Sequence, residues 1–237
     1  MLTKEQIVDL LKEKDEAVIE ALYRQADQVR KQYVGDAVHL RGLIEFSNYC
    51  KRDCLYCGLR RSNAEVVRYR MTMSEIFNAA QDAAKLGLQT VVIQSGEDPH
   101  ISIDDLCSLV QSIKTDIGFA VTLSIGERTY EDYKRLKEAG ADRYLLRFET
   151  TDPVLFKKLK PDSVYEKRFQ CLEWLAELGY QVGSGIMVGL PGQTMKVLPM
   201  TFSSSRNWRW IWWAWVPISL TPIHRYRAVR TEPWRWF

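Results

Sequence analysis

Short apolar runs rich in β-branched residues alternate with amphipathic helical patterns over residues 38–188, and this alternation restricts the fold most strongly. The pattern predicts strands at 38–46, 90–94, 120–124, 143–146 and 181–188, and helices at 74–86, 104–114, 131–139 and 165–178. Gly87, Gly140 and Gly179 follow three of these helices, where helix-ending glycines are expected. Strands joined through helices run parallel with right-handed crossovers, so the sequence predicts an α/β fold.

Polar or glycine-rich clusters directly follow every predicted strand. They are Ser47–Asn48, Ser95–Asp98, Ser124–Glu127, Arg147–Thr150 and Gly189–Gln193. Chemistry gathers at the carboxyl ends of parallel strands. Five consecutive loops of this character favour a TIM-type (βα) barrel, here ending after about five strands, over an open doubly wound sheet. We therefore expect a partial barrel over residues 37–194, after an N-terminal helical extension over residues 1–36 with helices at 4–11 and 17–32.

Three cysteines, Cys50, Cys54 and Cys57, stand directly after the first predicted strand. We interpret them as three ligands of one 4Fe-4S cluster. Four thiolates would complete such a cluster, whereas three leave one iron without a protein ligand. An open metal position is what a catalytic site requires.

Other interpretations of the cysteines remain open at this point. A structural zinc site would need a fourth ligand, for which His39 is the local candidate. A redox pair at Cys54 and Cys57 would leave Cys50 unexplained. A disulfide framework would require a secreted chain, and the amino terminus lacks the order of charges and apolar residues of a signal peptide.

The Cys-x3-Cys-x2-Cys spacing, with Tyr56 before the last cysteine, resembles the radical S-adenosylmethionine (SAM) superfamily. In that superfamily the open iron binds the amino and carboxylate groups of SAM, and one electron cleaves SAM to methionine and a 5'-deoxyadenosyl radical. Further runs resemble the FeFe-hydrogenase maturase E family, a relative of biotin synthase and methylornithine synthase. These runs are residues 41–48, 54–61, 68–72, 94–99, 139–147 and 187–194.

This resemblance covers residues 1–194 and implies an anaerobic role in assembly of the hydrogenase H-cluster. The implied substrate is an iron-cysteine complex carrying carbonyl and cyanide, received from maturase G, and the two-iron product would pass to maturase F. An electron donor such as ferredoxin or flavodoxin is also implied. The alternatives are a radical SAM amino-acid mutase of the methylornithine synthase type and a catalytically dead iron-sulfur fragment.

The resemblance also assigns residues to the cofactor. Matching positions that hold SAM are Gln94, Arg147, Glu149 and Arg168, and Ser95 and Glu97 lie in a loop that contacts the methionine amino group in related enzymes. The chemistry agrees, because a carboxylate binds a guanidinium fork and an ammonium binds a carboxylate. A structural ion pair between Arg147 and Glu149 is the competing interpretation. Thr122 and Ser124 share one face of a strand, so we expect them to line the substrate cavity.

Composition points to the cytoplasm, since three of the five cysteines are clustered and no run approaches the ~18 apolar residues of a membrane span. The net charge of +3 gives no indication of nucleic-acid binding. That charge is unevenly distributed: residues 195–237 contain seven Lys or Arg and a single acid, Glu232, whereas residues 1–194 contain 26 basic and 29 acidic residues.

Residues 195–237 form an aberrant Trp/Arg-rich tail. Seven of the eight tryptophans lie there, and the run Trp208–Trp215 has neither helical nor strand periodicity. Tryptophan has one codon, so the shifted reading frame is partly fixed, and it is compatible with a helix, a strand and a loop. We therefore expect a frameshift, a tail that packs little against the rest, and a chain left poorly soluble and inactive by open sheet edges.

Overall fold

The computed structural model describes residues 3–194 and the backbone of residues 212–217. These residues belong to two compact units, with the boundary between Leu40 and Arg41. The first unit contains helices α1 (Lys4–Lys12) and α2 (Glu16–Val34). Thr3 begins α1 with a reciprocal capping box and Asp15 caps α2, and neither helix has a buried residue.

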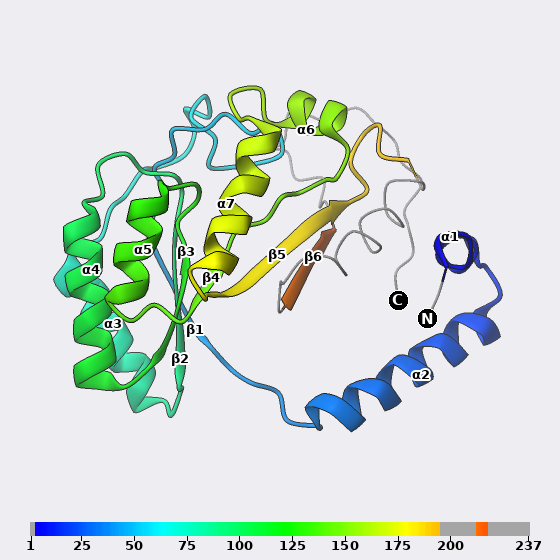
Figure 1. Cartoon of the computed structure of the whole chain (residues 1–237), viewed down its shortest axis with the longest axis horizontal. Coiled ribbons are helices and arrows are strands. Elements are labelled where there is room, and N and C mark those ends of the chain that lie inside the picture. Colours follow the sequence, from blue (N-terminus) through cyan, green and yellow to red (C-terminus); the bar gives the residue numbers. More distant parts are fainter. Residues whose placement is uncertain (1–2, 195–211, 218–237) are drawn as a thin grey trace. The chain divides into compact units, whose positions relative to one another are not determined.

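The second unit is built on one parallel sheet (Figure 1). Its strands are β1 (Gly42–Ser47), β2 (Thr90–Ser95), β3 (Ala120–Ser124), β4 (Arg143–Leu145), β5 (Gln181–Val188) and β6 (Trp212–Pro217). Its helices are α3 (Met73–Lys85), α4 (Ile103–Ser112), the π-helical turn η1 (Ile113–Ile117), α5 (Tyr130–Glu138), α6 (Pro153–Leu159) and α7 (Tyr165–Glu177).

The strand order β1-β2-β3-β4-β5-β6 follows the chain without a reversal, and every neighbouring pair is parallel. A doubly wound sheet would reverse its order at a switch point, whereas a (βα) barrel adds each strand beside the last. Helices α3, α4, α5 and α7 lie along one side of the sheet (Figure 1). The structure therefore confirms the partial TIM-type barrel.

The two faces of the sheet differ in burial. Val91 and Ile93 of β2 are fully buried, whereas Val92 and Gln94 between and after them are half-buried. Because side chains alternate along a strand and paired residues of parallel strands share a face, Gln94 lies in one row with Glu45 and Ser124. This row forms the inner, cavity-side face of the partial barrel.

Most predicted elements are confirmed within two residues, and β3 and β5 have the predicted bounds. The prediction that the first strand begins at residue 38 is wrong, because pairing starts only where Gly42 meets Val91. His39 is therefore not a strand residue; it lies in an exposed irregular segment. Helix α6 was not predicted.

The tail contributes a sixth strand that was not predicted either. Residues Trp212–Pro217 pair in parallel with Gly183–Val188 of β5, so these six residues differ from the expectation that the tail packs little against the rest. A parallel ladder is made by backbone groups and needs no side-chain alternation. The remainder of the expected frameshifted segment, 195–211 and 218–237, lies outside the described residues. In the described part of the chain, no helix combines the length and apolarity that crossing a membrane requires.

Candidate functional site

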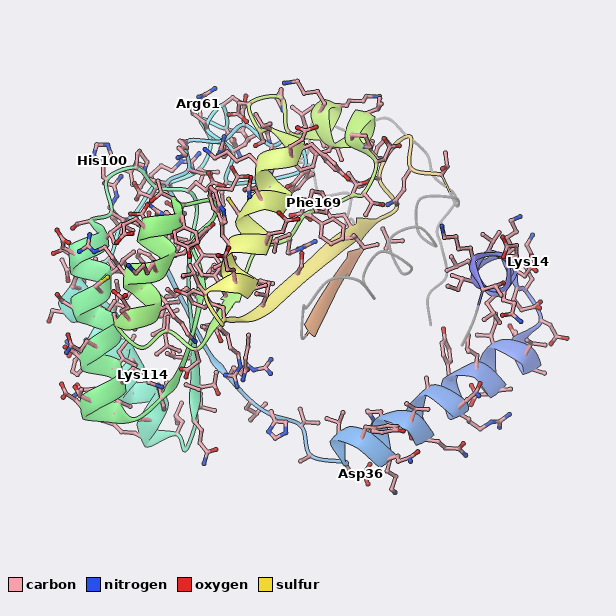
Figure 2. All side chains as sticks on the ribbon, in the orientation of Figure 1. Lys14, Asp36, Arg61, His100, Lys114 and Phe169 are labelled. Atoms are coloured by element: carbon pink, nitrogen blue, oxygen red, sulfur yellow. The ribbon has the colours of Figure 1, made fainter. Side chains whose placement is uncertain are left out.

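The three cysteines lie in the loop that leaves the carboxyl end of β1, and all three are free thiols. The Cys57 amide donates to the Cys54 carbonyl at 3.0 Å, so these two residues occupy one tight turn. Figure 2 shows Arg61 of this loop and His100, which follows β2, toward one end of the sheet unit and Lys114 toward the other. Burial raises the pKa of Cys54 to about 11 and also raises that of Cys57. Ligation of these thiols to a metal would therefore release protons.

Backbone hydrogen bonds fix the cysteine loop to two neighbouring segments. The Lys51 amide donates to the Glu97 carbonyl at 2.9 Å, and the Leu55 amide donates to the Leu159 carbonyl at 2.9 Å. The Arg52 guanidinium also donates to the Asp162 carbonyl at 2.7 Å. The loop is thus held both by the segment after β2 and by the end of α6.

Gly96 allows the cysteine loop to approach β2. A Cβ atom at this position would lie 2.2 Å from the Tyr49 carbonyl oxygen and 2.8 Å from the Cys50 Cβ, so the backbone beside Cys50 would have to move. We expect Gly96→Ala to reduce cluster loading severalfold, measured as iron and sulfide per chain after anaerobic reconstitution.

Gly87→Ala provides the control for that variant. Nothing lies within 4 Å of a Cβ at Gly87, but its φ of +79° makes alanine unfavourable by about 1 kcal/mol. This control should lose stability and still load a full cluster. Full loading of Gly96→Ala would show that the close approach is not needed.

Arg147 and Glu149 follow β4 and form an ion pair with an Nη2–Oε2 distance of 3.0 Å. Glu149 is the one non-glycine residue with positive φ in the described chain, at 71°, a conformation that costs energy and clusters at functional sites. Arg147 Nε and Glu149 Oε2 are buried and make no hydrogen bond among the described residues, although the ion pair brings them close. The pair thus retains one donor and one acceptor for a ligand with a carboxylate and an ammonium.

Glu97 and Arg168 belong to a second, fully connected ion-pair network. Arg52 contacts Glu97 at 2.6 Å and Glu127 at 2.8 Å, and Arg168 Nη1 lies 3.0 Å from Glu127 and 3.6 Å from Glu97. Arg168 Nε donates to the Arg147 carbonyl at 2.9 Å. Burial alone would raise the pKa of Glu97, but Arg168 and Arg52 outweigh it and hold that pKa below its ordinary value. The network joins the cysteine loop to the segments after β2 and β3 and to α7.

The remaining predicted residues occupy the strand ends. Gln94 Nε2 donates to Glu45 Oε1 at 2.8 Å, and Ser95 Oγ donates to the Gly96 carbonyl at 2.8 Å. Thr122 is buried and Ser124 is half-buried, on the same face of β3 as expected. All of these residues lie at the carboxyl-end half of the sheet, and their role toward a substrate stays a prediction.

Sequence reasoning missed three buried polar residues near the cysteines. Glu127 ends one of the strand-end clusters, and that position was a usable signal. Arg52 stands between two of the cysteines, but its partners are 45 and 75 residues away in sequence, so no local pattern indicates them. Lys160, which follows α6, is only 2% exposed and has an electrostatic interaction with the thiols of Cys54 and Cys57.

The donor set fits an iron-sulfur cluster better than a single ion. Among the described residues, no three His, Cys, Asp or Glu side chains converge closely enough to hold one metal ion. In a 4Fe-4S cluster each thiolate binds a different iron, so the three sulfurs need not converge on one point. Three unpaired thiols on one loop, beside a buried cation and the incompletely paired Arg147 and Glu149, are what an open-sited cluster with a bound amino acid group requires.

Comparisons with known proteins agree with this geometry. Residues 44–203 match the family described as the Radical SAM superfamily, whose cofactors are a 4Fe-4S cluster and SAM. The chain is 53% identical over 193 residues to the "[FeFe] hydrogenase maturase subunit HydE" of Thermotoga maritima, which covers 81% of this chain and 55% of that protein. It is 32% identical over 191 residues to the 3-methylornithine synthase of Methanosarcina barkeri, covering 80% of this chain and 54% of that enzyme.

A solved structure resembles the fold closely. The crystal structure of methylornithine synthase (PylB) superposes with a TM-score of 0.87 at 27% identity, covering 92% of this chain and 65% of that one. The chain spans about half the length of the curated relatives it matches.

Proposed function

Because this chain belongs to the radical SAM superfamily, we propose that it is an enzyme that reductively cleaves SAM during assembly of the FeFe-hydrogenase active site. The 53% identity to HydE supports this proposal more strongly than any other observation, because it is well above the identity to the methylornithine synthases. We place the activity in the cytoplasm, where free thiols such as all five here persist.

A cluster bound at Cys50, Cys54 and Cys57 supplies the electron that cleaves SAM and the open iron that chelates it. The chain's own residues position the reactants. Arg147 offers a guanidinium N–H to a carboxylate, and Glu149 offers a carboxylate oxygen to an ammonium. Gln94, Ser95, Glu97 and Arg168 complete the proposed SAM contacts, and the inner-face residues Thr122 and Ser124 are proposed to line the substrate cavity.

The proposed substrate is an iron-cysteine complex carrying carbonyl and cyanide. In this proposal maturase G delivers the complex, maturase F receives the product, and a ferredoxin or flavodoxin supplies electrons. The similarity to HydE supports this assignment. The second candidate is an amino-acid mutase, favoured by the TM-score of 0.87 to methylornithine synthase.

The test is activity of the anaerobically reconstituted protein with SAM and a reductant. Release of 5'-deoxyadenosine supports a radical SAM enzyme, and acceleration by the iron-cysteine complex rather than by lysine separates the two candidates. A bound cluster without any SAM cleavage would show a catalytically dead iron-sulfur protein instead.

Arg147→Gln is expected to weaken SAM binding about tenfold to a hundredfold, since a hydrogen bond to a charged group contributes roughly 1.5–3 kcal/mol. The cluster should be retained, because Arg147 lies outside the cysteine loop. Equilibrium dialysis of the reconstituted protein measures the affinity, and cluster absorbance is recorded on the same sample.

Arg143→Gln is the matched control. Arg143 lies on the same strand and bonds to Gln181 at 2.8 Å, away from the proposed ligand. Its SAM affinity should equal that of the unsubstituted protein. An Arg147→Gln protein with normal affinity and a much lower melting temperature would identify the Arg147–Glu149 pair as structural.

A further inference from the structure

Lys160 is a buried cation without a matching anion in the described chain. It is 2% exposed and directly follows α6. None of the carboxylates in residues 3–194 lies within the 4.0 Å that defines an ion pair with its ammonium. The contact printed nearest to its Nζ is the ring of Phe156, whose centroid is 5.5 Å away.

The surroundings of Lys160 are the cysteine loop. The residue before it, Leu159, accepts a hydrogen bond from the Leu55 amide at 2.9 Å, and Asp162 Oδ2 accepts one from the Asp53 amide at 3.0 Å. Two backbone anchors therefore hold the Lys160 segment against the residues on both sides of Cys54. Among the charged groups near Lys160 are Glu149, Glu127 and Arg168, in addition to the cysteine thiols.

An unpaired ammonium in this position is costly. Burial is the main cause that lowers the pKa of Lys160, and the Arg168 guanidinium lowers it further. Buried charges persist in proteins when an opposite charge offsets the loss of solvent. The position therefore requires an anion close to Cys54.

We propose that Lys160 is the counter-cation of the iron-sulfur cluster and raises its reduction potential. This inference rests on the cluster of the proposed function. A 4Fe-4S core carries fewer positive charges than three thiolates carry negative ones, so the assembly is anionic and becomes more so on reduction. A fixed cation beside Cys54 stabilises the reduced form more than the oxidised form, and net charge is a main determinant of cluster potentials.

Lys160→Met is the central test, with the reconstituted full chain titrated against a reductant in the absence of SAM and the reduced cluster followed by its paramagnetic signal. At a fixed applied potential, we expect a roughly tenfold lower ratio of reduced to oxidised cluster, which is about 59 mV for one electron. Lys160→Arg should restore the original potential. Lys158→Met, which removes an exposed lysine from α6, should leave it unchanged.

A second measurement separates this role from a structural one. Without the cluster, Lys160→Met should melt at the same temperature as the unsubstituted protein or higher, because it removes an uncompensated buried charge. Lys160→Gln replaces it if the methionine variant does not fold.

Three outcomes overturn the inference. The first is an unchanged potential in a fully loaded Lys160→Met or Lys160→Gln protein. The second is an unchanged potential with a tenfold loss of SAM affinity, which would make the SAM carboxylate the anion. The third is absence of any cluster in the unsubstituted protein, which would reject the proposed function together with the role of Lys160.

Discussion

Replacing any one of Cys50, Cys54 and Cys57 by alanine is expected to abolish the 4Fe-4S cluster. Each thiolate binds a separate iron, so one substitution leaves two irons without protein ligands. Anaerobic reconstitution should give no broad visible absorbance and no paramagnetic signal on reduction. Because the loop's hydrogen bonds to Glu97 and Leu159 are made by backbone atoms of other residues, the protein itself should stay folded.

Cys107→Ala provides the matched control, since Cys107 is a half-buried free thiol in α4, outside the cysteine loop. Its cluster should be indistinguishable from that of the unsubstituted protein. If two of the three loop variants kept a normal cluster, the assignment of the ligands would be wrong.

Sequence periodicity predicted the interior of the sheet more accurately than its margins. Strand β3 has the predicted bounds because its apolar pattern coincides with pairing to β2 along its whole length. The first strand was predicted four residues too early, since Val38 and Leu40 look strand-like in sequence yet are 84% and 71% exposed. A strand needs a partner as well as a pattern, and pairing with β2 begins at Gly42.

Helix α6 was missed although its start carries a local signal. Asp152 accepts hydrogen bonds from the amides of Val154 and Leu155, and Pro153 occupies the first helical turn. With seven residues, the helix is too short to show a clear apolar period. Its position matters because the residue that follows it, Lys160, is brought to the cysteine loop.

The candidate site could be predicted only in part for a related reason. The cysteine spacing is local and survives in the linear sequence, so the cluster ligands were accessible to it. Arg147 and Glu149 lie two residues apart and were accessible in the same way. The network of Arg52 with Glu97 and Glu127 joins positions far apart in the chain, and pairing of that kind depends on the closed arrangement of strand ends.

Glu127→Ala is expected to destabilise the cluster-free protein by about 3–5 kcal/mol, because it removes one partner of a buried ion pair and leaves Arg168 incompletely compensated. The side chains of Glu127 and Arg168 are 2% and 7% exposed, so solvent screens their interaction little. Urea unfolding monitored by circular dichroism measures the loss. Glu173→Ala removes an exposed carboxylate from α7 and should change stability by less than ~0.5 kcal/mol.

The same network gives a sign for the dependence of stability on pH. The folded-state pKa of Glu97 is below its ordinary value of 4.5, so its contribution is present above that value and is lost as the pH falls through the lowered pKa. Glu97→Gln should therefore flatten the acid limb of the stability profile. A small loss for Glu127→Ala, with an unaltered acid limb for Glu97→Gln, would contradict a structural network and leave Arg168 with cofactor binding as its main role.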